Sequence, residues 1–147
     1  MIYQIDQSGK IEDTNRLTIV AVANGRSKIL KISASEKQRL IKAMRALGYP
    51  QKTFIYKIFA GLIFLLLKNE RIEEVVIDNE YPGHEATIKN IIIQLFQKIK
   101  IKTPQISFDT IGKQSNAHKA ALEAFRGKRK IDITIKSKQV LELFYRK

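Results

Sequence analysis

The stretch RLTIVAVANGRSKILKI, residues 16–32, joins two apolar segments through an Asn-Gly pair. Residues 16–24 form a nearly continuous run of β-branched and small apolar side chains, which is typical of a strand covered on both faces. Asn-Gly at 24–25 is a strong signal for a tight hairpin turn, and residues 26–32 then alternate between polar and apolar. We therefore predict an antiparallel hairpin over this stretch.

The segments on either side of the hairpin extend this prediction. Residues 2–6 (IYQID) read as a short strand, so the first three strands form an antiparallel meander. After the hairpin the apolar spacing changes to that of a helix, with a stripe formed by Leu40, Ile41, Met44 and Leu47. Ser33 or Ser35 caps this helix, which stops before Gly48.

The rest of the chain alternates between helical and extended patterns. In order, it predicts a helix over 53–69, a strand over 72–78, a helix over 84–99, a strand over 105–111, a helix over 115–125, a short extended piece and a last helix near 137–145. Three antiparallel strands followed by alternating helices and strands indicate an α/β fold. No linker or repeat interrupts the sequence, so we expect one domain over 1–147, in which 127–147 form a basic C-terminal extension and helix.

Composition restricts the classes of function. The chain has no cysteine, which excludes disulfides, zinc–thiolate sites and thiol catalysis. The start of the sequence lacks the layout of a signal peptide, and the apolar run IFAGLIFLLL (58–67) is about half the roughly 20 residues of a membrane span. We expect this run to be a buried helix, the protein to be cytoplasmic, and no membrane partner.

The charge is strongly positive. Twenty-seven Lys and Arg against fourteen Asp and Glu give a formal net charge of +13. Such a field attracts polyanions, and it favours a nucleic-acid partner over the alternative of a lysine-rich surface of the kind found in thermophiles.

The sequence IDQSGK (5–10) resembles the Asp-x-Ala/Ser-Gly-Lys/Arg turn of type 2 ribonucleases H. The order of the elements is likewise similar to that of the ribonuclease H-like superfamily, whose core is a mixed five-stranded sheet with helices on both faces. The chain departs from the pattern at Gln7, where a second acid often stands.

The resemblance implies a metal site. It would bring Asp6, at the end of the first strand, beside Asp78, at the end of the fourth, because these strands are parallel neighbours in the superfamily. Two carboxylates that close repel each other unless a divalent cation holds them. A third ligand comes from a later helix in the superfamily; here that helix offers His118, as in the Asp-Asp-His sites of some relatives.

On this resemblance the chain is a nuclease that hydrolyses phosphodiester bonds by a two-metal mechanism with Mg²⁺ or Mn²⁺. Asp6, Asp78 and His118 would be both the metal ligands and the catalytic residues. The substrate is either structured DNA or an RNA–DNA hybrid. The alternative from another class is a non-catalytic nucleic-acid-binding module on the same scaffold. The oligomeric state stays open, with a homodimer among the options.

Each candidate residue also has an ordinary structural interpretation. Asp6 and Asp78 could cap turns, and His118, followed by apolar residues at helical spacing, could be a half-buried histidine. Glu80 is an alternative or additional ligand if the strand continues past Asp78. Glu85, in the first turn of its helix, is a surface acid favoured by the helix dipole or a more distant additional candidate.

Basic residues supply candidate contacts to nucleic acid, and they are Lys10, Lys113, Arg126, Lys128, Arg129 and Lys130. All lie in predicted loops or at helix ends, where they could meet phosphates or simply be solvated. Tyr81 could stack on a base or sugar, or pack against a neighbouring helix.

Overall fold

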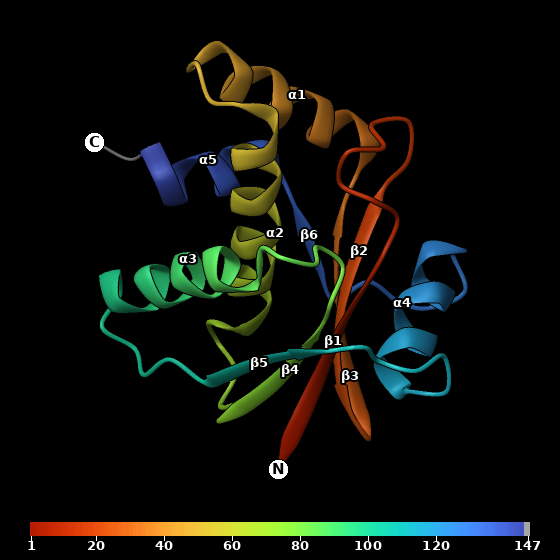
Figure 1. The fold of residues 1–147 in the computed structure, drawn as a ribbon. Coiled ribbons are helices and arrows are strands. Elements are labelled where there is room, and N and C mark those ends of the chain that lie inside the picture. Colours follow the sequence, from red (N-terminus) through yellow and green to blue (C-terminus); the bar gives the residue numbers. More distant parts are fainter. Residues whose placement is uncertain (146–147) are drawn as a thin grey trace.

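The computed structural model describes residues 1–145, and this part of the chain forms one six-stranded sheet and five helices (Figure 1). The strands are Ile2–Ser8 (β1), Thr18–Asn24 (β2), Arg26–Ile32 (β3), Glu74–Asp78 (β4), Gln105–Asp109 (β5) and Ile133–Ile135 (β6). The helices are Ala34–Ala46 (α1), Gln51–Leu67 (α2), Glu85–Lys98 (α3), Asn116–Phe125 (α4) and Ser137–Tyr145 (α5).

The sheet is mixed, and its strands lie in the order β5-β4-β1-β2-β3-β6. β1, β2 and β3 pair antiparallel, as the hairpin at residues 24–25 predicts. β4 is parallel to β1, and β5 is parallel to β4. These pairings confirm the predicted α/β class and the antiparallel meander at its start.

The sheet has six strands, so the expected count of five is wrong. The short extended piece that follows the basic segment 126–130 is β6, which pairs in parallel with β3. Two contacts hold it there: Ile135 is buried beside Ile32, and the Asp132 carboxylate accepts a hydrogen bond from the Ile29 N–H at 2.8 Å. The segment predicted as an extension thus adds a strand and a helix to the fold, although its last two residues lie outside the described part.

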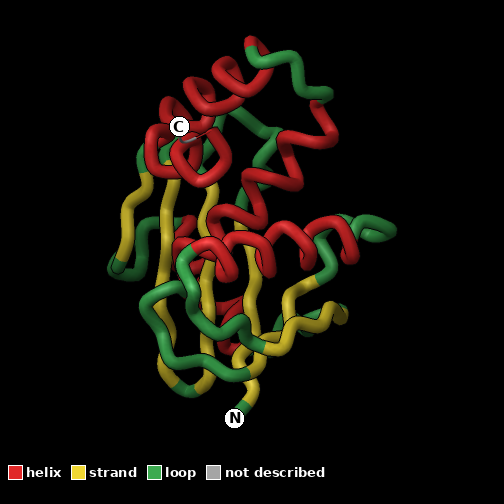
Figure 2. The backbone as a smooth tube through the Cα atoms, turned by 90° about the vertical axis from the view of Figure 1, so that its left-hand side faces the viewer, coloured by secondary structure: helices red, strands yellow, loops and turns green. Residues whose placement is uncertain are grey.

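Helices cover both faces of the sheet, as expected. Because side chains alternate along a strand, Val20 and Val22 of β2 enter the larger core while Ile19 and Ala21 enter a smaller one. Figures 1 and 2 show α4 alone on the smaller-core face and the other helices on the opposite side. This double coverage explains the continuous apolar run of β2.

Helix α2 lies at the centre of the larger core. Every residue from Ile58 to Leu67 is buried, because α2 contacts β2 and β3 as well as α1, α3 and α5. The prediction of a buried helix over this run is confirmed. Among the described helices, none combines the length and apolar character needed to cross a membrane.

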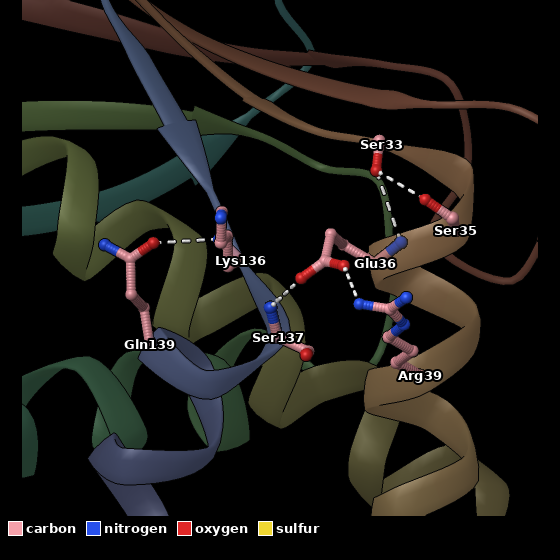
Figure 3. A network of polar contacts seen from close by, with 7 residues as sticks. All are labelled: Ser33, Ser35, Glu36, Arg39, Lys136, Ser137 and Gln139. Atoms are coloured by element: carbon pink, nitrogen blue, oxygen red, sulfur yellow. Dashed lines mark hydrogen bonds and ion pairs between the residues drawn. The ribbon is translucent and has the colours of Figure 1, made fainter.

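A polar junction joins the starts of α1 and α5 (Figure 3). The Ser33 hydroxyl accepts a hydrogen bond from the Glu36 N–H, so Ser33 rather than Ser35 is the cap of α1. The Glu36 carboxylate accepts hydrogen bonds from the Ser137 N–H at 2.9 Å and from Arg39 at 3.0 Å. Glu36 therefore links two segments 101 positions apart.

The turn after β1 depends on Gly9. β1 continues through Ser8, two residues beyond the predicted end, and Gly9 then adopts φ +82°. A Cβ atom at this position would overlap the Leu17 carbonyl oxygen and would lie 2.7 Å from the Phe125 ring at the end of α4. Only glycine therefore fits at this position, between Leu17 and the end of α4.

Substituting Gly9 should cost more stability than substituting a turn glycine with free space around it. Gly25 has φ +73°, but a Cβ atom added there would have no other atom within 4 Å, so Gly25→Ala adds only the cost of a left-handed conformation, about 1–2 kcal/mol. Gly9→Ala adds steric overlap of a further 1–3 kcal/mol or so. Denaturant unfolding of both variants measures this difference, and equal losses would contradict the close packing at Gly9.

Candidate metal centre

Parallel pairing of β1 with β4 places two aspartates side by side. The register pairs Ile5 with Ile77, so Asp6 and Asp78 occupy the next position on neighbouring strands. Ile5 and Ile77 belong to the larger core, and alternation turns the two aspartates to the opposite face, where α4 lies. Glu80 follows two residues later, and one carboxylate oxygen from each of the three acids lies within 4.8 Å of the others.

Backbone N–H groups fix two members of the carboxylate cluster, which consists of Asp6, Asp78 and Glu80. Asp6 is only 4% exposed; its Oδ1 accepts a hydrogen bond from the Gln7 N–H at 2.7 Å, within the strand rather than at a turn. Asp78 Oδ1 accepts one from the Ile111 N–H at 2.8 Å. Each carboxylate oxygen has two lone pairs, so both aspartates keep acceptor capacity for a cation.

The cluster is electrostatically unfavourable when no cation is bound. Burial raises the pKa of Asp6 against the opposing hydrogen bonds from Gln7 and His118, and the Asp78 charge raises it further. Burial, followed by the charges of Asp78 and Asp6, raises the pKa of Glu80 to about 7, and Lys10 offsets part of that rise. Three converging acids in this state are a donor set that suits a divalent cation with oxygen ligands.

His118 reaches the site from the first turn of α4. The cap residue Ser115 accepts a hydrogen bond from the His118 N–H, and the alanine-rich face of α4 packs closely on the sheet. His118 Nδ1 lies 2.9 Å from Asp6 Oδ2. This separation fits a hydrogen bond, and it equally fits two ligands at right angles on one ion, which lie about 3.0 Å apart when each bond is about 2.1 Å.

The structure therefore places His118 in contact with Asp6, but outside the group that the three acids form. Its ring nitrogens are not part of the group whose ligand atoms lie within 4.8 Å of one another; in the described residues that group contains the three carboxylates alone. Glu80, expected only as an alternative or additional ligand, belongs to the group. β4 ends at Asp78, so the loop, not a continued strand, turns Glu80 toward the aspartates.

Two other acidic or amide positions lie apart from the cluster. Gln7 pairs with Val20 and faces the larger core, so an acid at this position would point away from Asp6. The departure at Gln7 thus removes no ligand from this cluster. Glu85 lies in the first turn of α3, and its buried Oε1 has no hydrogen-bond partner among the described residues.

Tyr81 packs against α2 rather than standing free. Its ring lies edge-on to Phe59 and Tyr56, with centroid separations of 5.1 and 5.7 Å. Its hydroxyl donates to the Glu12 carboxylate at 3.5 Å, and burial raises the Tyr81 pKa. Packing is therefore the interpretation of Tyr81 that the geometry favours.

The predicted basic residues lie in two groups around α4. Lys10 follows Gly9 in the loop after β1, and Lys113 lies two residues after Ile111, whose N–H binds Asp78; both are exposed. The second group follows the C-terminal end of α4 and consists of Arg126, Lys128, Arg129 and Lys130, all exposed. Arg129 is already paired, since it donates to Glu123 at 2.7 Å and to Ser27 at 2.7 Å. Its charge is therefore partly offset.

Glu80 should make the stability of the metal-free protein depend on pH. The folded state binds a proton more tightly than the unfolded state, so the folded protein loses stability as the pH rises from about 4.5 to about 7. Between pH 5 and 8, wild type should lose about 2–3 kcal/mol relative to Glu80→Gln. Denaturant unfolding in EDTA measures this, with Glu73→Gln, an exposed acid, as the control. Parallel pH profiles for wild type and Glu80→Gln would contradict it.

The sequence matches no protein-family model and no curated protein. What this site can do therefore follows from its own donor set. That set is one carboxylate within β1, one at the end of β4 and one in the loop that follows β4, with a histidine on the buried acid and lysines on the adjoining loops.

Proposed function

We propose that the chain is a divalent-metal-dependent nuclease with a ribonuclease H-like fold. The observation that carries the proposal is the convergence of Asp6, Asp78 and Glu80 from two adjacent parallel strands of a strongly basic protein. A protein of net charge +13 gathers three acids here against their mutual repulsion, which is the arrangement expected where a cation mediates contact with a polyanion.

The sheet topology supports the proposed fold. β1 lies between β4 and β2, antiparallel to β2 and parallel to β4, and this matches the resemblance drawn from the order of elements. β6 is an additional strand at the far edge, beside β3 and away from the carboxylate cluster. The proposed fold thus concerns the five strands β1 to β5 and the helices that cover them.

The residues present fit Mg²⁺ or Mn²⁺. Asp6, Asp78 and Glu80 supply the oxygen ligands that both ions prefer, and the His118 imidazole is better tolerated by Mn²⁺. Ions bound there would supply Lewis-acid stabilisation for the charge that develops on a phosphate during hydrolysis. The side chains have their own part: Gln7 N–H and Ile111 N–H fix the two aspartates, and His118 orients Asp6.

The basic loops would bind the substrate backbone. Lys10 and Lys113 lie on two different loops that adjoin the cluster, so both could contact a phosphate chain that crosses the site. Contacts of this type carry no base sequence information, and they suit recognition of backbone geometry in structured DNA or in an RNA–DNA hybrid. We propose backbone recognition without choosing between these two substrates.

Removing one aspartate should abolish cleavage without unfolding the protein. Asp6→Asn and Asp78→Asn should each lower the rate in Mn²⁺ or Mg²⁺ by a factor of about 100 or more, because an amide is a poor ligand for both ions. Asp109→Asn is the matched control: Asp109 pairs with Asp78 across β4 and β5 but is exposed and outside the cluster. Gel assays on four-way junction DNA, single-stranded DNA and an RNA–DNA hybrid measure the rates.

Two outcomes would contradict the nuclease proposal. In one, Asp6→Asn cleaves as fast as Asp109→Asn. In the other, wild type binds nucleic acid with the same affinity in EDTA and in Mn²⁺ and cuts none of the substrates; the chain would then be a non-catalytic binding module.

Lys10→Ala and Lys113→Ala should weaken binding of all duplexes to a similar degree. Each lost phosphate contact lowers the slope of log affinity against log salt by about 0.7–0.9. Lys102→Ala is the control, since Lys102 is exposed but precedes β5, at the end of the strand opposite Asp109. Binding titrations at several salt concentrations in Ca²⁺ test this. If Lys102→Ala changes the slope as much as the other two variants do, the nucleic-acid backbone follows no defined path across the basic surface.

A further inference from the structure

Lys37 of α1 is a fully buried lysine. It has no exposed surface, and its Nζ donates three hydrogen bonds: to the Lys10 carbonyl at 2.9 Å, to the Asp13 carbonyl at 2.6 Å and to the Thr18 hydroxyl at 3.0 Å. All three acceptors are neutral oxygens, and none of the ion pairs among the described residues includes Lys37. Burying an ammonium without a paired carboxylate costs free energy, and the three hydrogen bonds offset part of that cost.

The acceptors belong to one segment, the loop of residues 9–17 between β1 and β2, and to the residue that ends it. Thr18 is itself buried, and its hydroxyl donates to the Gly9 carbonyl at 3.0 Å, so the Lys37 ammonium and Thr18 together hold both ends of the loop. The next residue of α1 adds a fourth bond, from the Gln38 amide to the Thr14 carbonyl at 2.7 Å. The start of α1 thus fixes the path of the whole loop.

This loop lies near the segment that carries Glu80. Lys10 is exposed, and it lies close enough to Glu80 for its charge to lower the pKa of that carboxyl. Glu12 accepts the hydrogen bond from the Tyr81 hydroxyl, beside Glu80. The loop therefore lies against the segment that follows β4, with its lysine on the side of the cluster.

We propose that Lys37 is a positioning residue, whose buried ammonium holds the loop of residues 9–17 so that Lys10 stays on the Glu80 side of the carboxylate cluster. This inference rests on the proposed function, in which Lys10 meets a phosphate of the nucleic acid. Lys37 itself touches neither the cluster nor the surface. It acts through the Lys10 backbone.

An apolar residue at position 37 would pack against the core as well as the lysine side chain does. Lys37 continues the stripe of Leu40, Ile41 and Met44, which are all buried. Methionine has a similar length and would fill the same space, but it would remove the Nζ donor that ties the carbonyls of Lys10 and Asp13 to α1. These carbonyls would keep only the backbone N–H groups of Asp13 and Arg16, which belong to the loop itself. The lysine therefore specifies the loop and not the burial of the helix.

Protonation of Lys37 gives the arrangement a measurable signature. Burial lowers the Lys37 pKa to about 8, against the opposing charges of Asp13 and Glu12, the acids that face it. Above this pH the neutral amine has two N–H groups for three acceptors, so one loop contact is lost. The contact is complete below the pKa and lost as the pH rises through it.

Amide hydrogen exchange of the free protein tests the arrangement directly. Lys37→Met should speed exchange in residues 10–17 by about tenfold or more while the strand β2 changes by less than about twofold. Lys42→Met is the matched control, since Lys42 is an exposed lysine of the same helix. In wild type, protection of the same loop, corrected for intrinsic exchange, should fall between pH 7 and 9.5. This second measurement decides the question even if Lys37→Met does not fold.

A double-mutant cycle then tests the link to Lys10. Affinity for an RNA–DNA hybrid duplex and for junction DNA is measured in Ca²⁺ for wild type, Lys10→Ala, Lys37→Met and the double variant. Lys10→Ala should weaken binding about fivefold in wild type and less than about twofold in the Lys37→Met background, because an unfixed loop no longer presents Lys10. A residue that served only stability would lower the melting temperature and leave the Lys10 effect unchanged.

The outcomes separate this inference from the proposed function. Unchanged loop exchange in Lys37→Met, together with wild-type protection that is flat through pH 8, overturns the positioning role whatever the protein binds. An equal Lys10 effect in both backgrounds also overturns it. If wild type binds neither nucleic acid, the proposed function fails, and the exchange measurements alone then decide whether Lys37 holds the loop.

Discussion

The parallel pairing of β1 with β4 is the constraint on which the site depends. Backbone hydrogen bonds fix the register of the two strands, and that register places Asp6 next to Asp78. The cooperative stability of the sheet offsets their mutual repulsion, so the acids stay together even without a cation. Burial is the main cause of the raised pKa values of Asp6 and Glu80, and the neighbouring carboxylate charges raise them further.

The two faces of the sheet have different roles: one carries most of the apolar core, and the other carries the candidate site. On one face α2, fully buried along its C-terminal half, joins α1, α3 and α5 in a thick apolar layer that accounts for most of the core. On the other face a single helix packs through alanines, which lets its backbone come close enough for His118 to reach Asp6. The polar chemistry therefore lies on the thinly covered face, while stability comes mainly from the other.

Sequence periodicity predicted the elements that follow a single regular pattern. The hairpin at residues 24–25 and the buried helix over 58–67 follow from spacing. The adjacency of Asp6 and Asp78 was an implication of the family resemblance, and the register of β1 and β4 agrees with it. β6 was predicted only as a short extended piece, because its pairing with β3 depends on partners about 100 positions away, which no local pattern indicates. Glu80 joins the cluster through a loop, whose path no local pattern determines.

Charged residues were the hardest to place from sequence. Lysine is expected at the surface, yet the spacing from Lys37 to Leu40, Ile41 and Met44 already puts it on the buried stripe. That spacing was an available signal, but the oxygens that make burial tolerable come from a distant loop. Arg129 is the converse case, since its pairing with Glu123 and Ser27 depends on how the chain turns back along β3.

The position of β6 has a consequence for synthesis on the ribosome. The meander of β1 to β3 emerges first, but the outer edge of β3 has to wait for about a hundred further residues before Ile133–Ile135 arrive to cover it. Until then a nascent chain displays an unpaired row of N–H and carbonyl groups, the kind of template that recruits strands from other polypeptides. The charged residues Arg26, Lys28 and Lys31 along that strand discourage such recruitment during the delay.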